Sequence, residues 1–181
     1  LFYQDKIIIS GRTILPFPPI PAIILIPFII IFKNVSQQSV SILFGAINTL
    51  LVYFLLKKYT NVKNSILLCL FFAFGTVAFW ASVVGTTWYF AHTIAITFFV
   101  LSLIAHKKGE NFLSGVLFSL AALSRYPMIV GGIFFFLELF KEPKKLLRFL
   151  SGAFIFIPIQ LIYNYLRFGS FFDMGYYEVY K

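Results

Sequence analysis

The sequence predicts an all-α integral membrane protein that crosses the bilayer several times. Of its 181 residues, 60% are hydrophobic and 12% are charged, and the mean hydropathy is +0.92. A soluble domain is about half apolar and about a quarter charged, so this chain carries more apolar surface than a soluble fold of its size can bury. The apolar residues also form long blocks separated by short charged clusters, the pattern of membrane-spanning helices and their loops.

The net charge of +9 arises from basic residues in the short segments between these blocks. In a soluble protein that charge would indicate nucleic acid, but membrane topology explains it here, and we expect no nucleic-acid partner. Cys69 is the one cysteine, so no intrachain disulfide forms, and the sequence lacks Cys/His metal spacing. The chain opens at Leu1 without a Met or a signal-peptide pattern, which indicates an internal fragment.

The first apolar block, Leu15–Phe32, is rich in proline, with prolines at 16, 18, 19, 21 and 27. Proline removes a backbone donor and kinks a helix. The block can therefore be a membrane-spanning helix with a proline-rich entry, or a helix that lies on the membrane surface. The residues alone leave both readings open.

Six later blocks predict further spans. A full crossing takes about 20 residues, within a range of about 17–25. The fourth block, Phe112–Ser124, and the fifth, Met128–Phe140, are therefore short. These two meet at Ser124-Arg125-Tyr126-Pro127. The six expected spans are Ser39–Leu56, Ser65–Ser82, Tyr89–Ala105, Phe112–Ser124, Met128–Phe140 and Leu146–Leu166.

The distribution of Lys and Arg predicts the orientation, because cytoplasmic loops carry the excess of basic residues. One set of alternating loops holds nine basic residues and the other holds Lys33, Arg125 and Arg167. We expect the first set to be cytoplasmic and the second to be extracytoplasmic. The nine residues are Lys57, Lys58, Lys63, Lys107, Lys108, Lys141, Lys144, Lys145 and Arg148. Glu138 and Lys141 predict an ordinary surface ion pair on one helix.

Arg125 is the strongest candidate for a functional residue. It stands between two short apolar blocks, and an ionisable residue at membrane depth is costly and by default functional. Its planar guanidinium suits a phosphate. The alternative is an Arg whose head group reaches the membrane interface.

Trp88, Tyr89 and His92 can share one helix face at the outer end of a span. A polar and aromatic cluster at that place fits a sugar-binding cleft. The competing interpretation is an interfacial belt of aromatic residues, which Trp and Tyr form in many membrane proteins.

A polar stripe made by Gln160, Asn164 and Arg167 at i, i+4, i+7 ends at the same face. Such a stripe usually packs against other helices. In the tail that follows, Asp173 is either a site residue or a helix cap. Asp5, the one acid before the first apolar block, can serve as a general base only if the N-terminal segment is extracytoplasmic.

Four stretches of sequence occur together in a specific order. They are Gly11-Arg12 with the prolines up to Pro27-Phe28; Gly75-Thr76 and Trp80 with Gly85-Thr-Thr-Trp-Tyr89 and His92; Ser114-Gly-Val-Leu-Phe-Ser-Leu-Ala-Ala-Leu-Ser-Arg125-Tyr-Pro127; and Tyr163-Asn-Tyr-Leu-Arg167-Phe-Gly-Ser170 with Gly175-Tyr176. In these stretches the chain resembles the GT-C membrane glycosyltransferases, in the branch of protein O-mannosyltransferases and aminoarabinose transferases. Ser124 stands where Thr is more usual in that branch.

The resemblance implies a GT-C type helical bundle with a proline-rich juxtamembrane helix before about six transmembrane helices. Residues 1–38 would form an extracytoplasmic loop segment that contains this helix, 39–167 the transmembrane bundle, and 168–181 a second extracytoplasmic segment. It also implies an integral membrane protein, which we place in a bacterial inner membrane, with its active face extracytoplasmic.

The resemblance further implies transfer of a sugar from a polyprenyl-phosphate donor to a glycan, lipid or protein acceptor. Arg125 and Arg167 would bind the donor phosphate, and Asp5 would be a catalytic carboxylate. The cleft would be lined by Trp88, Tyr89, His92, Tyr126 and Asp173. The family's main acidic motif is expected upstream of Leu1. Some relatives use a divalent metal, and the sequence shows no complete site for one. The alternatives are a transporter or lipid flippase, and a non-catalytic membrane subunit.

Overall fold

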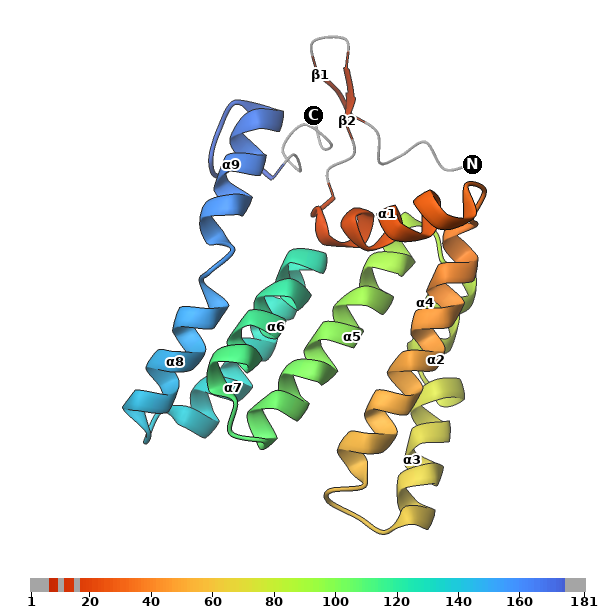
Figure 1. Cartoon of the computed structure of the whole chain (residues 1–181), viewed down its shortest axis with the longest axis vertical. Coiled ribbons are helices and arrows are strands. Elements are labelled where there is room, and N and C mark those ends of the chain that lie inside the picture. Colours follow the sequence, from red (N-terminus) through yellow and green to blue (C-terminus); the bar gives the residue numbers. More distant parts are fainter. Residues whose placement is uncertain (1–6, 10–11, 15–16, 175–181) are drawn as a thin grey trace. The chain divides into compact units, whose positions relative to one another are not determined.

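The computed structural model describes residues 7–9, 12–14 and 17–174. The chain divides into two compact units, one of Leu1–Pro18 with Ile155–Lys181 and one of Pro19–Phe154. The larger unit is helical, and the described part of the smaller unit contains one helix, α9 (Figure 1), so with its apolar spans the predicted helical membrane protein is confirmed. The smaller unit also holds a short antiparallel hairpin of β1 (Ile7–Ile9) and β2 (Arg12–Ile14), which the sequence did not predict.

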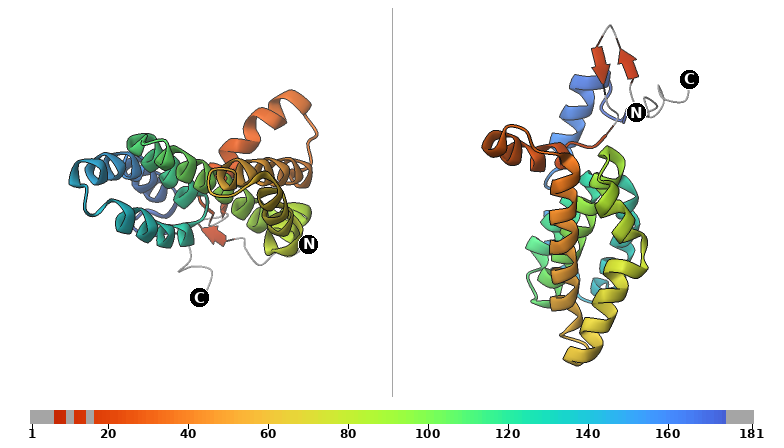
Figure 2. Two further views of the ribbon diagram at one scale, coloured as in Figure 1. Left: turned by 90° about the horizontal axis from the view of Figure 1, so that it is seen from below. Right: turned by 90° about the vertical axis from the view of Figure 1, so that its right-hand side faces the viewer.

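The larger unit is a bundle in which α2, α5 and α6 run side by side, while α1 lies across the ends of α2 and α5 (Figures 1 and 2). Ile24 and Phe28 of α1 pack on a buried cluster of Val40, Phe90 and Ile94. The helices of this unit are α1 (Ile20–Phe32), α2 (Gln37–Leu56), α3 (Val62–Gly75), α4 (Val77–Val84), α5 (Thr87–Lys107), α6 (Asn111–Ser124), the 3-10 helix η1 (Tyr126–Gly131), α7 (Gly132–Leu139) and α8 (Pro143–Ala153).

Three helical stretches of the described chain are long and apolar enough to cross a membrane: Gln37–Leu56, Thr87–Lys107 and Pro143–Phe168. The bent pair α3 and α4 makes a fourth if it counts as one span. A helix of 20 residues, such as α2, is about 30 Å long, which matches the hydrocarbon core. With 13 residues, α1 reaches only about 20 Å and is too short to cross alone.

The expected span Ser65–Ser82 consists of two helices and not one. Gly75 ends α3, Thr76 is extended, and α4 then departs at 55°. The Thr76 hydroxyl donates to the Phe72 carbonyl at 2.7 Å and accepts from the Ala78 N–H at 3.1 Å. One side chain thus caps the end of α3 and the start of α4, which lets the break persist in an apolar setting.

The expected span Met128–Phe140 is not one regular helix, because it begins as the 3-10 helix η1 and becomes α-helical only at Gly132. The expected span Leu146–Leu166 lies within Pro143–Phe168, which is long and apolar enough to cross a membrane. A turn at residues 154–156 separates α8, in the larger unit, from α9 (Ile157–Phe168), in the smaller.

Buried hydrogen bonds join α2 to α5. Asn48 donates through Nδ2 to the Thr93 carbonyl at 2.9 Å, and its Oδ1 accepts from the Thr97 hydroxyl at 2.6 Å. The Ser41 and Thr93 hydroxyls lie 3.4 Å apart. Because lipid offers these groups no alternative partner, the bonds hold the two helices in one register.

Replacing Asn48 by alanine is therefore expected to lower the free energy of unfolding by about 1–2 kcal/mol, since both helix-to-helix bonds are lost. Unfolding of the complete protein in detergent micelles measures the effect. The matched control is Asn34→Ala, at an exposed position outside the bundle core. An equal loss of stability in both variants would contradict this role for Asn48.

Two glycines let α6 and α8 pack closely. A Cβ placed on Gly115 would meet the Phe149 carbonyl oxygen, and one placed on Gly152 would meet the Phe112 carbonyl oxygen. On its other side α6 is tied to α5, because the Ser102 hydroxyl donates to the Ser114 carbonyl at 2.8 Å. Helix α6 is therefore held by α5 and by α8 at the same level along its axis, at Ser114 and Gly115.

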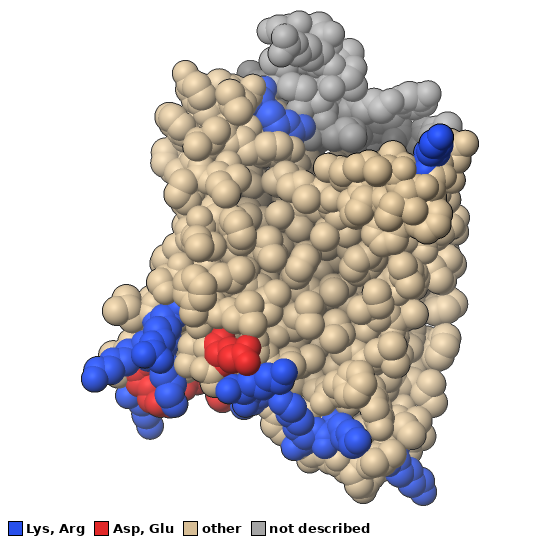
Figure 3. Space-filling view, in the orientation of Figure 1, with Lys and Arg blue, Asp and Glu red and all other residues tan. Residues whose placement is uncertain are grey.

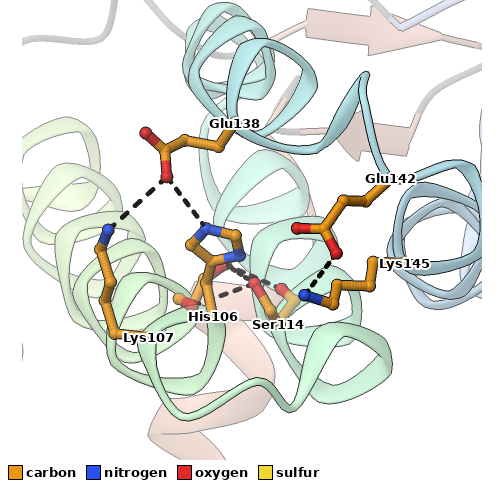
Figure 4. Close-up of polar contacts among 7 residues, drawn as sticks. His106, Lys107, Ser114, Glu138, Glu142 and Lys145 are labelled. Carbon is orange, nitrogen blue, oxygen red and sulfur yellow. Dashed lines mark hydrogen bonds and ion pairs between the residues drawn. The ribbon is translucent and has the colours of Figure 1, made fainter.

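The nine basic residues predicted to be cytoplasmic lie in or next to three loops, which join α2 to α3, α5 to α6 and α7 to α8. All three loops are at one end of the larger unit, which we call the basic end (Figures 1 and 3). Glu138 does not form the predicted pair with Lys141. It lies 3.6 Å from Lys107 Nζ and 3.7 Å from His106 Nε2, and so connects α7 with α5 (Figure 4). Packing of α7 on α5 offers Glu138 a closer partner than its own helix does.

Candidate functional site

Arg125 marks the end of α6, at the end of the bundle opposite the basic end. Its N–H still donates to the Ala121 carbonyl at 3.0 Å, but its own backbone is extended, with φ −150° and ψ 113°. The 3-10 helix η1 begins at the next residue, Tyr126, and has Pro127 in its first turn. The Ser124-Arg125-Tyr126-Pro127 sequence thus turns the chain and leaves the Arg125 side chain 5% exposed.

The Arg125 guanidinium is stacked on the indole of Trp88, with Cζ 3.9 Å from the ring centroid. Trp88 is in the first turn of α5, and the His92 ring lies 6.1 Å from the indole. The structure thereby brings together three of the predicted site residues from two helices. A guanidinium that stacks through its face keeps its N–H groups in its own plane, and this planar fork suits an oxyanion.

The turn before Trp88 is fixed by α2. Gly85 has φ +55°, and a Cβ on it would approach the Gln38 Cα to 2.6 Å, so both conformation and space require glycine. Gln37 donates to the Gly85 carbonyl at 2.9 Å, and Gln38 donates to the Val83 carbonyl at 2.7 Å. We did not predict these two glutamines as site residues. Their position at the start of an apolar block was the available signal.

Tyr89 and Tyr126 belong to the same end of the bundle. Tyr89 follows Trp88 in the first turn of α5, is half-buried, and accepts the Thr93 hydroxyl on its carbonyl at 3.1 Å. Tyr126 follows Arg125 directly and is also half-buried. Tyr89 is therefore next to Trp88, and Tyr126 next to Arg125, in the sequence.

Arg167 and Asp173 belong to the smaller unit. Arg167 donates to the Tyr163 hydroxyl at 2.6 Å and to the Phe17 carbonyl at 3.3 Å. In the predicted polar stripe, Gln160 donates to Asn164 at 2.7 Å and Asn164 donates to the Phe171 carbonyl at 3.0 Å. Asp5 lies outside the described residues, so its predicted catalytic role stays a prediction.

The described residues do not fit a bound metal. They contain no group of three His, Cys, Asp or Glu side chains that could hold an ion. The carboxylates described in the larger unit are Glu110, Glu138 and Glu142, which all lie in or next to the loops of the basic end.

A comparison with protein-family models matches residues 17–167 to the family described as dolichyl-phosphate-mannose-protein mannosyltransferase. The match includes the described site residues other than Asp173. Comparisons with curated proteins and with solved structures give no match. Together with the apolar helices, the family match confirms an integral membrane protein and the predicted GT-C resemblance. The chain belongs to the dolichyl-phosphate-mannose-protein mannosyltransferase family, a GT-C type family of membrane glycosyltransferases.

Proposed function

We propose that this protein transfers a sugar from a polyprenyl-phosphate donor to a glycan, lipid or protein acceptor on the extracytoplasmic side of the membrane. The observation that carries the proposal is the buried, Trp88-stacked guanidinium of Arg125 at the end of the bundle. Family membership supplies the reaction class, and Arg125 supplies chemistry suited to a lipid-linked phosphate.

The phosphate assignment rests on the chemistry of the guanidinium and on its position. An ionisable residue at membrane depth is a candidate functional residue, and the planar fork of arginine matches the geometry of a phosphate. Two rigid helix ends hold Arg125 in place, so its position need not reorganise when charge develops on a leaving phosphate. Arg167, whose guanidinium is held by Tyr163 and Phe17, is the second proposed phosphate ligand.

The proposed orientation follows from the loops. The basic end faces the cytoplasm by the excess of Lys and Arg, so the opposite end with Arg125 and Trp88 faces outward. Helix α1, too short to cross alone, would lie along the outer membrane surface as the juxtamembrane helix. The apolar, lysine-rich composition suits a bacterial inner membrane.

The proposed reaction is an inverting displacement at the anomeric carbon. A carboxylate takes the proton of the acceptor, whose oxygen attacks the anomeric carbon as the bond from that carbon to the phosphate oxygen breaks. The electron pair leaves with the polyprenyl phosphate, and Arg125 stabilises the charge that develops there. Asp5 is the candidate carboxylate in this chain. Trp88, Tyr89, His92, Tyr126 and Asp173 are proposed to line the cleft.

A transporter or flippase is the second candidate, favoured by the break between α3 and α4. Transporters often bind ions or substrates where a helix unwinds at mid-membrane. At this break, however, the Thr76 hydroxyl is used in capping both helix ends. The residues around it therefore offer an ion little coordination, and the glycosyltransferase remains the better-supported function.

The complete protein in membranes, supplied with labelled polyprenyl-phosphate sugars, is expected to release polyprenyl phosphate and to transfer the label. Both products follow from the proposed displacement. A parallel flux assay with the same vesicles serves as the comparison. Movement of substrate or lipid across the bilayer with no donor consumed would overturn the proposal in favour of a transporter.

A further inference from the structure

A cavity of about 260 Å³ lies between α2, the bent pair α3 and α4, and α5. On α2 its wall is formed by residues between Ile42 and Thr49, near the middle of a helix that is about 30 Å long. On α5 it is formed by Thr93 and Ile96. The cavity therefore lies along the spanning part of the bundle and reaches Val83, near the end of α4.

The shape of the cavity arises from small residues and from the break in the chain. Gly45, Ala73 and Ala78 leave space where larger side chains would fill it. The 55° bend at Gly75 and Thr76 directs α4 away from the axis of α3. Phe74 and Phe79 meet across the bend with ring centroids 5.7 Å apart, and they are 68% and 44% exposed, so they form a rim that faces the lipid.

The wall of the cavity offers no free polar group to a ligand. Its four polar side chains are each bonded within the protein. Thr49 donates to the Gly45 carbonyl at 3.0 Å, Ser82 to the Ala78 carbonyl at 2.8 Å, and Thr93 to the Tyr89 carbonyl at 3.1 Å. Asn48 is held by its two bonds to α5. Water, ions and sugars need polar partners, so the occupant is apolar.

The cavity is also separate from the Arg125 site. Trp88 and His92 point from α5 toward Arg125, whereas Thr93 and Thr97 point toward α2. At 100° per residue these two pairs lie on well-separated faces of α5. The body of α5 therefore stands between the cavity and a phosphate bound at Arg125, which argues against the donor's own chain as the occupant.

We propose that this cavity binds one acyl chain of a bilayer phospholipid as an integral part of the folded protein. An apolar cavity of about 150 Å³ is enough to bind benzene, so this one accepts a longer hydrocarbon segment. The lipid fills the space at the bend and fixes the angle between α3 and α4. This site is independent of the proposed transferase reaction.

The test uses the complete protein in vesicles that contain a phosphatidylethanolamine with a diazirine on one acyl chain. After irradiation, the label is expected on residues 72–83. The variant Ala73→Leu/Ala78→Leu, which fills the cavity, is expected to lose most of this label. The matched control Ala22→Leu, at an exposed position on α1 outside the cavity, is expected to keep it.

A second measurement guards against a variant that is only misfolded. Removing lipid with detergent is expected to lower the Tm of the wild type and to lower that of the filled variant less, because leucine replaces the chain. Equal labelling of residues 72–83 in the filled and control variants would overturn the proposal. So would a photoreactive polyprenyl phosphate that labels these residues while the phospholipid does not.

Discussion

Replacing Arg125 by alanine is expected to lower sugar transfer by about 10²–10³-fold, the usual loss when one preorganised group that stabilises a developing negative charge is removed. The guanidinium is 5% exposed and its plane is fixed by the Trp88 indole, so no nearby mobile cation can replace it in the same geometry. The initial rate of polyprenyl phosphate release by the complete protein in membranes measures the effect.

The matched control is Arg148→Ala, which removes the same side chain from an exposed position on α8 at the basic end. Arg125→Lys is expected to give an intermediate loss, because lysine keeps the charge but lacks the planar fork. Thermal unfolding separates a functional role from a structural one. A functional role predicts that Arg125→Ala loses transfer at temperatures at which the variant is still folded, whereas a structural role predicts that transfer falls together with the Tm. Unchanged donor binding and turnover would instead support a non-catalytic subunit.

Composition and block length predicted most of the helices well. The predicted spans Ser39–Leu56, Tyr89–Ala105 and Phe112–Ser124 differ from α2, α5 and α6 by at most two residues at each end. These blocks end in charged or turn-forming segments, and the sharp fall in hydropathy there indicates where each helix ends. Of the six predicted spans, those at α6 and at the η1–α7 stretch are shorter than a full crossing.

The breaks within apolar blocks could not be predicted in the same way. Residues on both sides of Gly75 and Thr76 are equally apolar, so hydropathy reads one helix where the structure has two. Gly75 and Thr76 are the local signal, since glycine ends helices and threonine caps them. Whether such a pair breaks a helix depends on packing, and here α4 packs on α2 and α5 and receives the Ser41 hydroxyl on its Ala81 carbonyl.

At the candidate site, residue spacing predicted the contact between Trp88 and His92, whereas the contact between Arg125 and Trp88 arises from tertiary packing. Trp88 and His92 are four residues apart, and their rings are neighbours as the helix period requires. The stacking of Arg125 on Trp88 depends on how α5 packs on α6. Hydrogen bonds between Ser102 and Ser114 hold the two helices together, and small polar residues of this kind allow close helix contact in a membrane.

Replacing Gly115 by alanine is expected to lower the free energy of unfolding by about 2–3 kcal/mol, at the upper end of the cost of overpacking. The added Cβ would meet the Phe149 carbonyl oxygen and the Ala153 nitrogen, which are backbone atoms and cannot rotate away. Helices α6 and α8 must then separate. Because α6 ends at Arg125, the same shift should disturb its stacking on Trp88 and lower transfer as well.

The matched control is Gly132→Ala, also in a helical conformation, where the added Cβ would meet the end of the Phe118 ring at 3.1 Å. A side-chain ring can shift by a few tenths of an ångström, so this variant should lose much less stability. Thermal unfolding of both variants in detergent micelles gives the comparison, and transfer rates measured in parallel report on the site. If Gly115→Ala unfolds like the wild type, the α6–α8 contact is not the close backbone approach described above. If it is destabilised yet keeps full transfer activity, the position of Arg125 does not depend on that contact, and α5 alone holds it through Ser102 and Ser114.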